Sequence, residues 1–214
     1  MVQNLRGAIF DYGGVMSYSP LWRTQILADE MGVPADVFSK IIFFGESDSV
    51  SLNPWHEAEC GRQPLNDEFA ELMQKRLTSY GATFDLGIFI RWVSEAINEP
   101  DPVMVQTVKE LRETGVPVAL LTNAVREFRT VIESTLPVYE LFDVIVDSSE
   151  VGLRKPDSRI YELTASRLNL LPADCLMVDD LVENVNGAND VGMTGLLFSD
   201  SEKTAIEIRN FFTI

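Results

Sequence analysis

Short apolar segments alternate with amphipathic helical patterns over the second half of the chain, and this alternation is the strongest constraint on its fold. The apolar runs have the composition of strands that are buried on both faces of a parallel sheet. Repeated units of strand, helix and strand predict an α/β fold with a doubly wound parallel sheet. We expect the strands at residues 8–10, 116–121, 142–146, 175–178 and 194–198.

A purely helical pattern separates the first apolar run from the others. Between residues 18 and 100 apolar residues recur at helical spacing in several segments, which predicts a small inserted helical bundle. We therefore expect an α/β core domain formed by residues 1–17 and 101–214, and a helical cap domain at residues 18–100. The tryptophans of this insertion are expected to pack in its core rather than to stack on a ligand; they are Trp22, Trp55 and Trp92.

The charge and the hydropathy of the chain exclude two classes of partner. With 17 basic and 33 acidic residues the formal net charge is −16, which repels polyanions and argues against nucleic acid as a partner. No segment has the eighteen or so consecutive apolar residues of a membrane span, so no membrane partner is expected. The N-terminus has no export pattern and only two cysteines are present, from which we expect a cytoplasmic location.

Polar side chains follow four of the expected strands or lie in the loops beyond them. In open α/β sheets the ligand crevice lies outside the carboxyl ends of the strands, so these side chains are expected to converge. Each has a plainer reading as a helix cap, a loop lysine or a residue that compensates a helix dipole. Finding all of them in one chain favours a shared site. The residues are Asp11, Thr122, Asn123, Lys155, Asp179 and Asp180.

The chemistry of such a site is that of a metal ion and a phosphate. Three converging carboxylates repel one another, so they require a cation, and Mg²⁺ prefers carboxylate and carbonyl oxygens. Asp11 and Asp180 can supply the carboxylates, and the Gly13 carbonyl can point toward the ion. Lys155 and Thr122 can then receive the phosphate of a small phosphorylated metabolite despite the acidic surface.

The same stretches resemble the signature of the haloacid dehalogenase superfamily. They read Phe-Asp-Tyr-Gly-Gly-Val at residues 10–15, Leu-Thr-Asn at 121–123, Gly-Leu-Arg-Lys-Pro-Asp at 152–157 and Val-Asp-Asp-Leu-Val-Glu-Asn-Val at 178–185. Order and spacing match over the whole chain, and the helical insertion corresponds to the C1 cap of the superfamily. The pattern is most similar to bacterial sugar 1-phosphate phosphatases and to the phosphatase half of soluble epoxide hydrolases.

The resemblance implies a role for each of these residues. Asp11 would be the nucleophile that forms an aspartyl-phosphate, which water then hydrolyses. Thr122, Asn123 and Lys155 would bind the phosphoryl group. Asp11, Gly13, Asp180 and Asp179 would hold Mg²⁺, with Asp179 as a direct or outer ligand, and Asn184 would support them. The implied function is a magnesium-dependent phosphatase for a sugar phosphate or a similar phosphomonoester.

Gly13 departs from the family pattern. Phosphatases of the superfamily usually have there a second Asp, which protonates the leaving oxygen and activates water. Either the leaving group of the substrate needs little protonation, as in an anomeric phosphate, or the cap supplies a substitute acid. The candidates for that acid are Glu46, Asp48, His56 and Glu57. The alternative is a catalytically weak phosphate-binding or regulatory protein. A 2-haloacid dehalogenase is less favoured, because its pattern has Tyr at position 13 and no metal-binding pair at 179–180.

Overall fold

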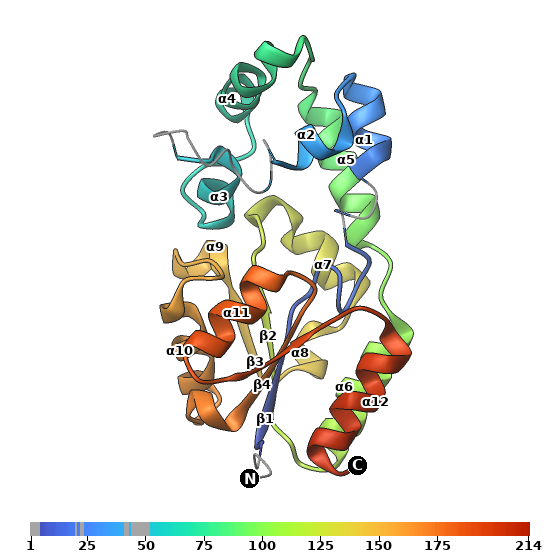
Figure 1. Ribbon diagram of the computed structural model, residues 1–214, viewed down its shortest axis with the longest axis vertical. Coiled ribbons are helices and arrows are strands. Elements are labelled where there is room, and N and C mark those ends of the chain that lie inside the picture. The colour runs from blue at the N-terminus through green and yellow to red at the C-terminus, as the bar shows by residue number, and fades with distance from the viewer. Residues whose placement is uncertain (1–4, 20, 22–23, 41–42, 44–51) are drawn as a thin grey trace.

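The computed structural model describes residues 5–19, 21, 24–40, 43 and 52–214. Its centre is a five-stranded parallel sheet in the order β3-β2-β1-β4-β5, with helices on both faces, as the sequence predicts (Figure 1). Phe10 of β1 pairs with Leu120 of β2 and with Val178 of β4, so the carboxyl ends of the three central strands lie level. The strands are β1 (Gly7–Phe10), β2 (Val118–Thr122), β3 (Val144–Asp147), β4 (Cys175–Asp179) and β5 (Thr194–Leu197).

Alternate residues of the central strands enter two separate hydrophobic clusters, one on each face of the sheet. In β1, Phe10 packs into the larger cluster and Ile9 into the smaller one, and both are fully buried. This explains the unbroken apolar runs in the sequence, since neither face of these strands meets water. The helices of the core are α6 (Pro102–Glu113), α7 (Arg129–Thr135), α8 (Val138–Leu141), α9 (Ser148–Val151), α10 (Ser158–Arg167), α11 (Val182–Asp190) and α12 (Ser201–Phe212), with the 3₁₀ turns η4 (Arg126–Phe128) and η5 (Pro172–Asp174).

The segment between β1 and α6 is helical and lies beyond the carboxyl end of the sheet (Figure 1). The chain enters and leaves it at one place, where Tyr18 N donates to Glu99 O and Asp101 N donates to Met16 O. The predicted domain boundaries at 17/18 and 100/101 stay predictions. The helices are α1 (Thr24–Met31), α2 (Ala35–Ser39), α3 (Pro54–Glu59), α4 (Asp67–Leu77), η3 (Thr78–Tyr80) and α5 (Leu86–Ile97).

Aromatic rings fill the interior of this helical segment around Phe89 of α5. Phe89 is fully buried, and its ring centroid lies 5.4 Å from those of both Trp55 and Phe84. Trp55 and Trp92 are buried in the same cluster, which agrees with the predicted core packing, whereas Trp22 lies outside the described residues. Trp55 also lines a cavity at the edge of this cluster. Aromatic pairs at this spacing stabilise a core beyond their buried area.

A second contact joins the helical segment to the core at the end of α3. Ser148 Oγ donates to the Glu59 carbonyl oxygen at 2.5 Å, and Arg62 Nη1 donates to the Gly152 carbonyl oxygen at 3.1 Å. Gly61 has a φ of +68°, and a Cβ there would lie 2.3 Å from the Ser149 carbonyl oxygen. Only glycine allows this approach without displacing the backbone, so α3 is fixed directly over α9.

Two short helices, α8 and α9, lie in segments for which the sequence predicts no helix or strand. Each has four residues, which is too short for a helical period of apolar residues to be visible. None of the helices in the described part of the chain combines the length and the apolar character that crossing a bilayer requires.

The aromatic cluster makes a prediction about stability. Replacing Phe89 by Ala removes a fully buried ring and leaves a cavity, so we expect the free energy of unfolding to fall by about 3–5 kcal/mol. Leu171→Ala, at a position that is 68% exposed, is the control and should change it by less than about 0.5 kcal/mol. Chemical denaturation measures both. Equal losses in the two variants would show that the cluster does not stabilise the fold.

Candidate active site

One cavity lies between the carboxyl end of the sheet and the helical segment, with a volume of about 290 Å³. Most of the predicted site residues line it. Asp11 follows β1, Thr122 ends β2, and Asp180 follows β4. Because these strands end at the same level, the three side chains lie together at the carboxyl edge of the sheet. The remaining predicted residues on the cavity wall are Gly13, Asn123 and Lys155. Asp179 does not line the cavity but contacts Lys155.

Lys155 is the centre of the polar network. Its side chain is fully buried, and Nζ lies 2.7 Å from Asp11 Oδ1 and 2.6 Å from Asp179 Oδ2. Burial alone would lower the pKa of Lys155, but the two carboxylates raise it above its ordinary value. The ammonium therefore stays charged and fixes the side chains that end β1 and β4.

Asn123 holds the backbone of Lys155 in place. Its Nδ2 donates to the Lys155 carbonyl oxygen at 3.1 Å, and its Oδ1 accepts from the Lys155 amide at 2.8 Å. The side-chain amide of Asn123 thus makes the two hydrogen bonds that a neighbouring strand would otherwise make to this residue of the loop between β3 and α10. Because Asn123 follows β2 directly, this pair fixes the lysine relative to the central sheet.

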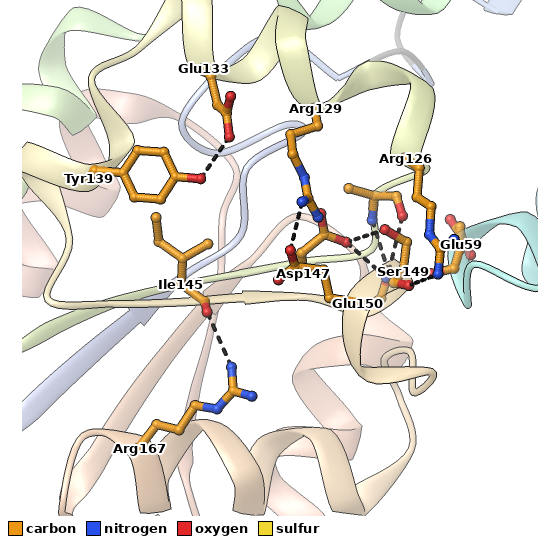
Figure 2. Close-up of polar contacts among 12 residues, drawn as sticks. Glu59, Arg126, Arg129, Glu133, Tyr139, Ile145, Asp147, Ser149, Glu150 and Arg167 are labelled. Carbon is orange, nitrogen blue, oxygen red and sulfur yellow. Dashed lines mark hydrogen bonds and ion pairs between the residues drawn. The ribbon is translucent and has the colours of Figure 1, made fainter.

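The loop that precedes Lys155 is held by a second group of polar contacts at the end of β3. Arg129 faces both Asp147 and Glu150 (Figure 2). Its Nη2 lies 2.8 Å from Asp147 Oδ2, and its Nη1 lies 2.6 Å from Glu150 Oε1. Asp147 Oδ1 also accepts from the amide and the hydroxyl of Ser149. Arg126 in the same view donates to the Ser149 carbonyl oxygen at 3.2 Å, next to Glu59 of α3. The start of α9 is therefore anchored to α7 and to η4.

The two acids after β4 have different surroundings. Asp179 is fully buried, and its Oδ1 accepts from Leu181 N and from Asn184 Nδ2. Asp180 faces the cavity and shares a hydrogen bond with Ser19. Gly14 leaves room for the Asp180 carboxylate at the cavity wall. The φ of Gly14 is +94°, and a Cβ on this residue would lie 2.1 Å from Asp180 Oδ2. A side chain at position 14 would displace the carboxylate.

The electrostatics of the cluster call for a further positive charge. Carboxylate oxygens of Asp11, Asp179 and Asp180 lie within 4.8 Å of one another. Burial raises the pKa of Asp11 to about 8, and the charges of Asp179 and Asp180 add to this effect. Burial, together with the charge of Asp179, raises the pKa of Asp180 to about 6. When all three carboxyl groups are ionised, the single charge of Lys155 leaves two negative charges in excess, and this excess adds to the effect of burial in raising the two pKa values. Such a set of hard oxygen donors fits a divalent cation such as Mg²⁺.

The cap residues predicted to substitute for an acid at position 13 are not equivalent. His56 lines the cavity, and its Nε2 donates to the Phe43 carbonyl oxygen at 2.6 Å. Burial, with nearby Arg154 adding to it, lowers the pKa of His56 to about 4. Glu57 pairs with Arg62 at 2.6 Å and is not among the lining residues. Glu46 and Asp48 lie outside the described residues.

Sequence reasoning missed a further pair on the cavity wall, Glu59 and Arg154. Glu59 is buried, its Oε2 lies 2.6 Å from Arg154 Nε, and burial raises the pKa of its carboxyl although Arg154 opposes this. The signal was present, because Glu59 follows Trp55 by four residues and so shares the buried face of α3. The pair links α3 to the residue next to Lys155.

Comparison with known proteins agrees with this geometry. The family described as haloacid dehalogenase-like hydrolase matches residues 6–192. Sesquiterpene phosphatase astK of Aspergillus oryzae is 29% identical over 98% of this chain and 97% of its own length. Bifunctional epoxide hydrolase 2 of Sus scrofa is 26% identical over 95% of this chain, which spans only 38% of that protein.

A solved structure shows the same fold. The predicted HAD-like family hydrolase of Porphyromonas gingivalis superposes with a TM-score of 0.68 at 20% identity, over 99% of each chain. The family match spans all four sequence stretches that form the cavity's polar end. This chain therefore belongs to the haloacid dehalogenase-like hydrolase family.

Proposed function

We propose that the chain is a magnesium-dependent phosphatase that hydrolyses a phosphomonoester of a small metabolite through a phosphorylated Asp11. One observation carries the proposal: Asp11 lies on the cavity wall with Oδ1 held 2.7 Å from the buried ammonium of Lys155. That contact orients the carboxylate and places a positive charge where phosphate oxygens would bind. Relatives named as phosphatases support the same reaction type.

The reaction divides into two displacements at phosphorus. A carboxylate oxygen of Asp11 attacks phosphorus, the ester P–O bond breaks, and its electron pair leaves on the alcohol oxygen, which takes a proton from water. Water then attacks the phosphorus of the aspartyl-phosphate, losing a proton to solvent, and releases inorganic phosphate and free Asp11. Thr122 and Lys155 would bind the phosphoryl oxygens in both steps, and Asn123 would hold the lysine in position.

Asp11 and Asp180 would hold Mg²⁺ together with the Gly13 carbonyl, and Asp179 would act as a direct or outer ligand. The ion, when bound, supplies the positive charge that lets a phosphate dianion enter beside three carboxylates. Asp179 already uses its oxygens on Lys155, Leu181 and Asn184, which favours an outer position for it.

Gly13 supports one alternative, a phosphate-binding or regulatory protein with little turnover. No side chain at this position can protonate a leaving group or activate water, a role worth about 10²–10⁴ in rate. Substrates whose leaving groups need little protonation would still react. Turnover therefore separates the two functions: a regulatory protein would bind phosphate without releasing it from such esters.

Replacing the proposed nucleophile tests the mechanism. Asp11→Asn keeps the size of the side chain but removes the nucleophilic carboxylate, so we expect Mg²⁺-dependent hydrolysis of an aryl phosphate to fall at least about 10³-fold. Asp190→Asn makes the same change at an exposed position of α11 and should leave the rate within twofold. Residual turnover in Asp11→Asn close to that of the control would exclude Asp11 as the nucleophile.

The raised pKa values predict how stability depends on pH and on the metal. Asp11 and Asp180 bind protons more tightly in the folded than in the unfolded chain, so without metal the melting temperature should fall as pH rises from about 5 to about 8. Mg²⁺ should offset this, raising the melting temperature by a few degrees more at about pH 8 than at about pH 5.5. Thermal melts in chelator and in Mg²⁺ measure both effects.

Asp180→Asn is the matched variant for this experiment, since it removes one charge from the metal site without removing the nucleophile. Its increment in melting temperature on adding Mg²⁺ should be smaller than that of the unaltered protein. An increment that is the same at both pH values and in both proteins would place the ion elsewhere.

Restoring an acid at position 13 tests the account of Gly13. We expect Gly13→Asp to raise the turnover of alkyl phosphates, which have poor leaving groups, by up to about 10²-fold. Turnover of aryl phosphates should rise as well, because the new Asp would also activate the water that attacks the aspartyl-phosphate common to both substrates. Gly13→Asn adds a side chain of the same size without a titratable proton and is the control. If alkyl phosphate turnover is the same in Gly13→Asp and Gly13→Asn, a missing acid does not limit the reaction.

A further inference from the structure

Away from the carboxylate and lysine end, most of the cavity wall consists of apolar side chains. The apolar side chains come from the helical segment and from the α/β core, so they line the cavity continuously and do not form one exposed patch. Trp55 belongs to α3, Phe43 stands on the same side, and their ring centroids lie 5.5 Å apart. The other members are Val93 and Ile97 of α5, Phe128 of η4 and Ile132 of α7, all of them buried.

Several polar side chains of this wall already have a partner within the protein. Glu59 and Arg154 form an ion pair with each other, and His56 donates to the Phe43 carbonyl oxygen. Asn123 uses both ends of its amide on the Lys155 backbone. Glu183 also lines the cavity, but it is exposed and carries the same sign of charge as a phosphate.

Hydroxyl groups of a sugar would therefore lose hydration in this cavity and find few partners among the described residues. Burying a polar group without a hydrogen bond costs free energy, whereas burying hydrocarbon against this wall gains it. The volume of about 290 Å³ lies near the lower end of the range of ligand pockets, which suits a small organic group. The wall thus favours ligands with an apolar organic group over ligands with hydroxyl groups, and it recognises no particular pattern of hydrogen-bonding groups.

We infer that the organic part of the ligand is a hydrocarbon chain or ring without free hydroxyls, so that the substrate class is a phosphomonoester of an apolar alcohol. The inference rests on the proposed function only in taking the carboxylate and lysine end as the phosphate site. It differs from the sugar phosphates that the sequence resemblance suggests. Residues at the cavity wall would determine specificity through their apolar area, and none of them would touch the reacting phosphorus.

Binding of phosphonates, which cannot be hydrolysed, tests the inference without relying on turnover. Titration calorimetry on the whole chain in Mg²⁺ would compare methyl-, butyl- and octylphosphonate with 2,3-dihydroxypropylphosphonate. A fully buried methylene is worth about fourfold in affinity, so we expect octylphosphonate to bind at least about 10²-fold more tightly than methylphosphonate. Butylphosphonate should bind at least about tenfold more tightly than the dihydroxy compound of similar size.

A variant of the wall locates the effect in this cavity. Ile132→Phe fills part of the space, so the ratio of octyl to methyl affinity should fall at least about tenfold. Ile206→Phe is the same substitution on α12 at a position that is 55% exposed, and it should keep the ratio of the unaltered protein. If Ile132→Phe does not fold, the chain-length series on the unaltered protein still decides the question.

The possible failures are distinct. Affinity independent of chain length, dihydroxypropylphosphonate binding as tightly as butylphosphonate, or no binding of any phosphonate would overturn the apolar ligand class. Chain-length dependence together with no Asp11-dependent hydrolysis of aryl phosphate would support the ligand class and overturn the phosphatase function instead.

Discussion

The buried ammonium of Lys155 is the constraint on which the rest of the site depends. A fully buried lysine requires neighbouring carboxylates, and here Asp11 and Asp179 lie within 2.7 Å of it. These two acids can meet on either side of one nitrogen because β1 and β4 are adjacent and in register. Asn123, at the end of β2 on the other side of β1, fixes the backbone of the lysine. The strand order thus determines the site's polar end.

The cavity combines two environments that different parts of the chain supply. The carboxylates at the edge of the sheet carry more negative charge than one ammonium balances, while the helical segment contributes Phe43 and Trp55 to the apolar wall. Glu59 and Arg154 join the two, because Glu59 ends α3 and Arg154 precedes the buried lysine. Movement of α3 would therefore act directly on the loop of Lys155. The charged end of the cavity and its apolar wall are thus physically linked.

Much of the fold was predictable because local patterns and global packing agree. Strands buried on both faces, such as β1 and β4, give continuous apolar runs, and their ends carry the residues that converge at Lys155. The predicted sheet and family are confirmed, whereas the roles of the site residues and the domain boundaries stay predictions.

Other features depend on contacts between distant segments, which no local pattern reveals. The apolar wall joins Val93 to Ile132 across two parts of the chain, and Asn123 turns toward Lys155 although it reads as a helix cap in sequence. The helix α9 is only four residues long and is held by Arg129 and Asp147, which lie in separate elements. Such tertiary contacts override what propensity alone suggests.

Trapping a covalent phosphoryl group tests the central claim most directly. Because position 13 has no side chain to activate water, we expect an aspartyl-phosphate to accumulate in acid-quenched mixtures with an aryl phosphate and Mg²⁺. Borohydride reduces an acyl phosphate to an alcohol, so peptide mass spectrometry should find homoserine in place of Asp11, and only after incubation with substrate. Active enzyme in which Asp11 stays unmodified, or in which another carboxylate is reduced, would contradict the account.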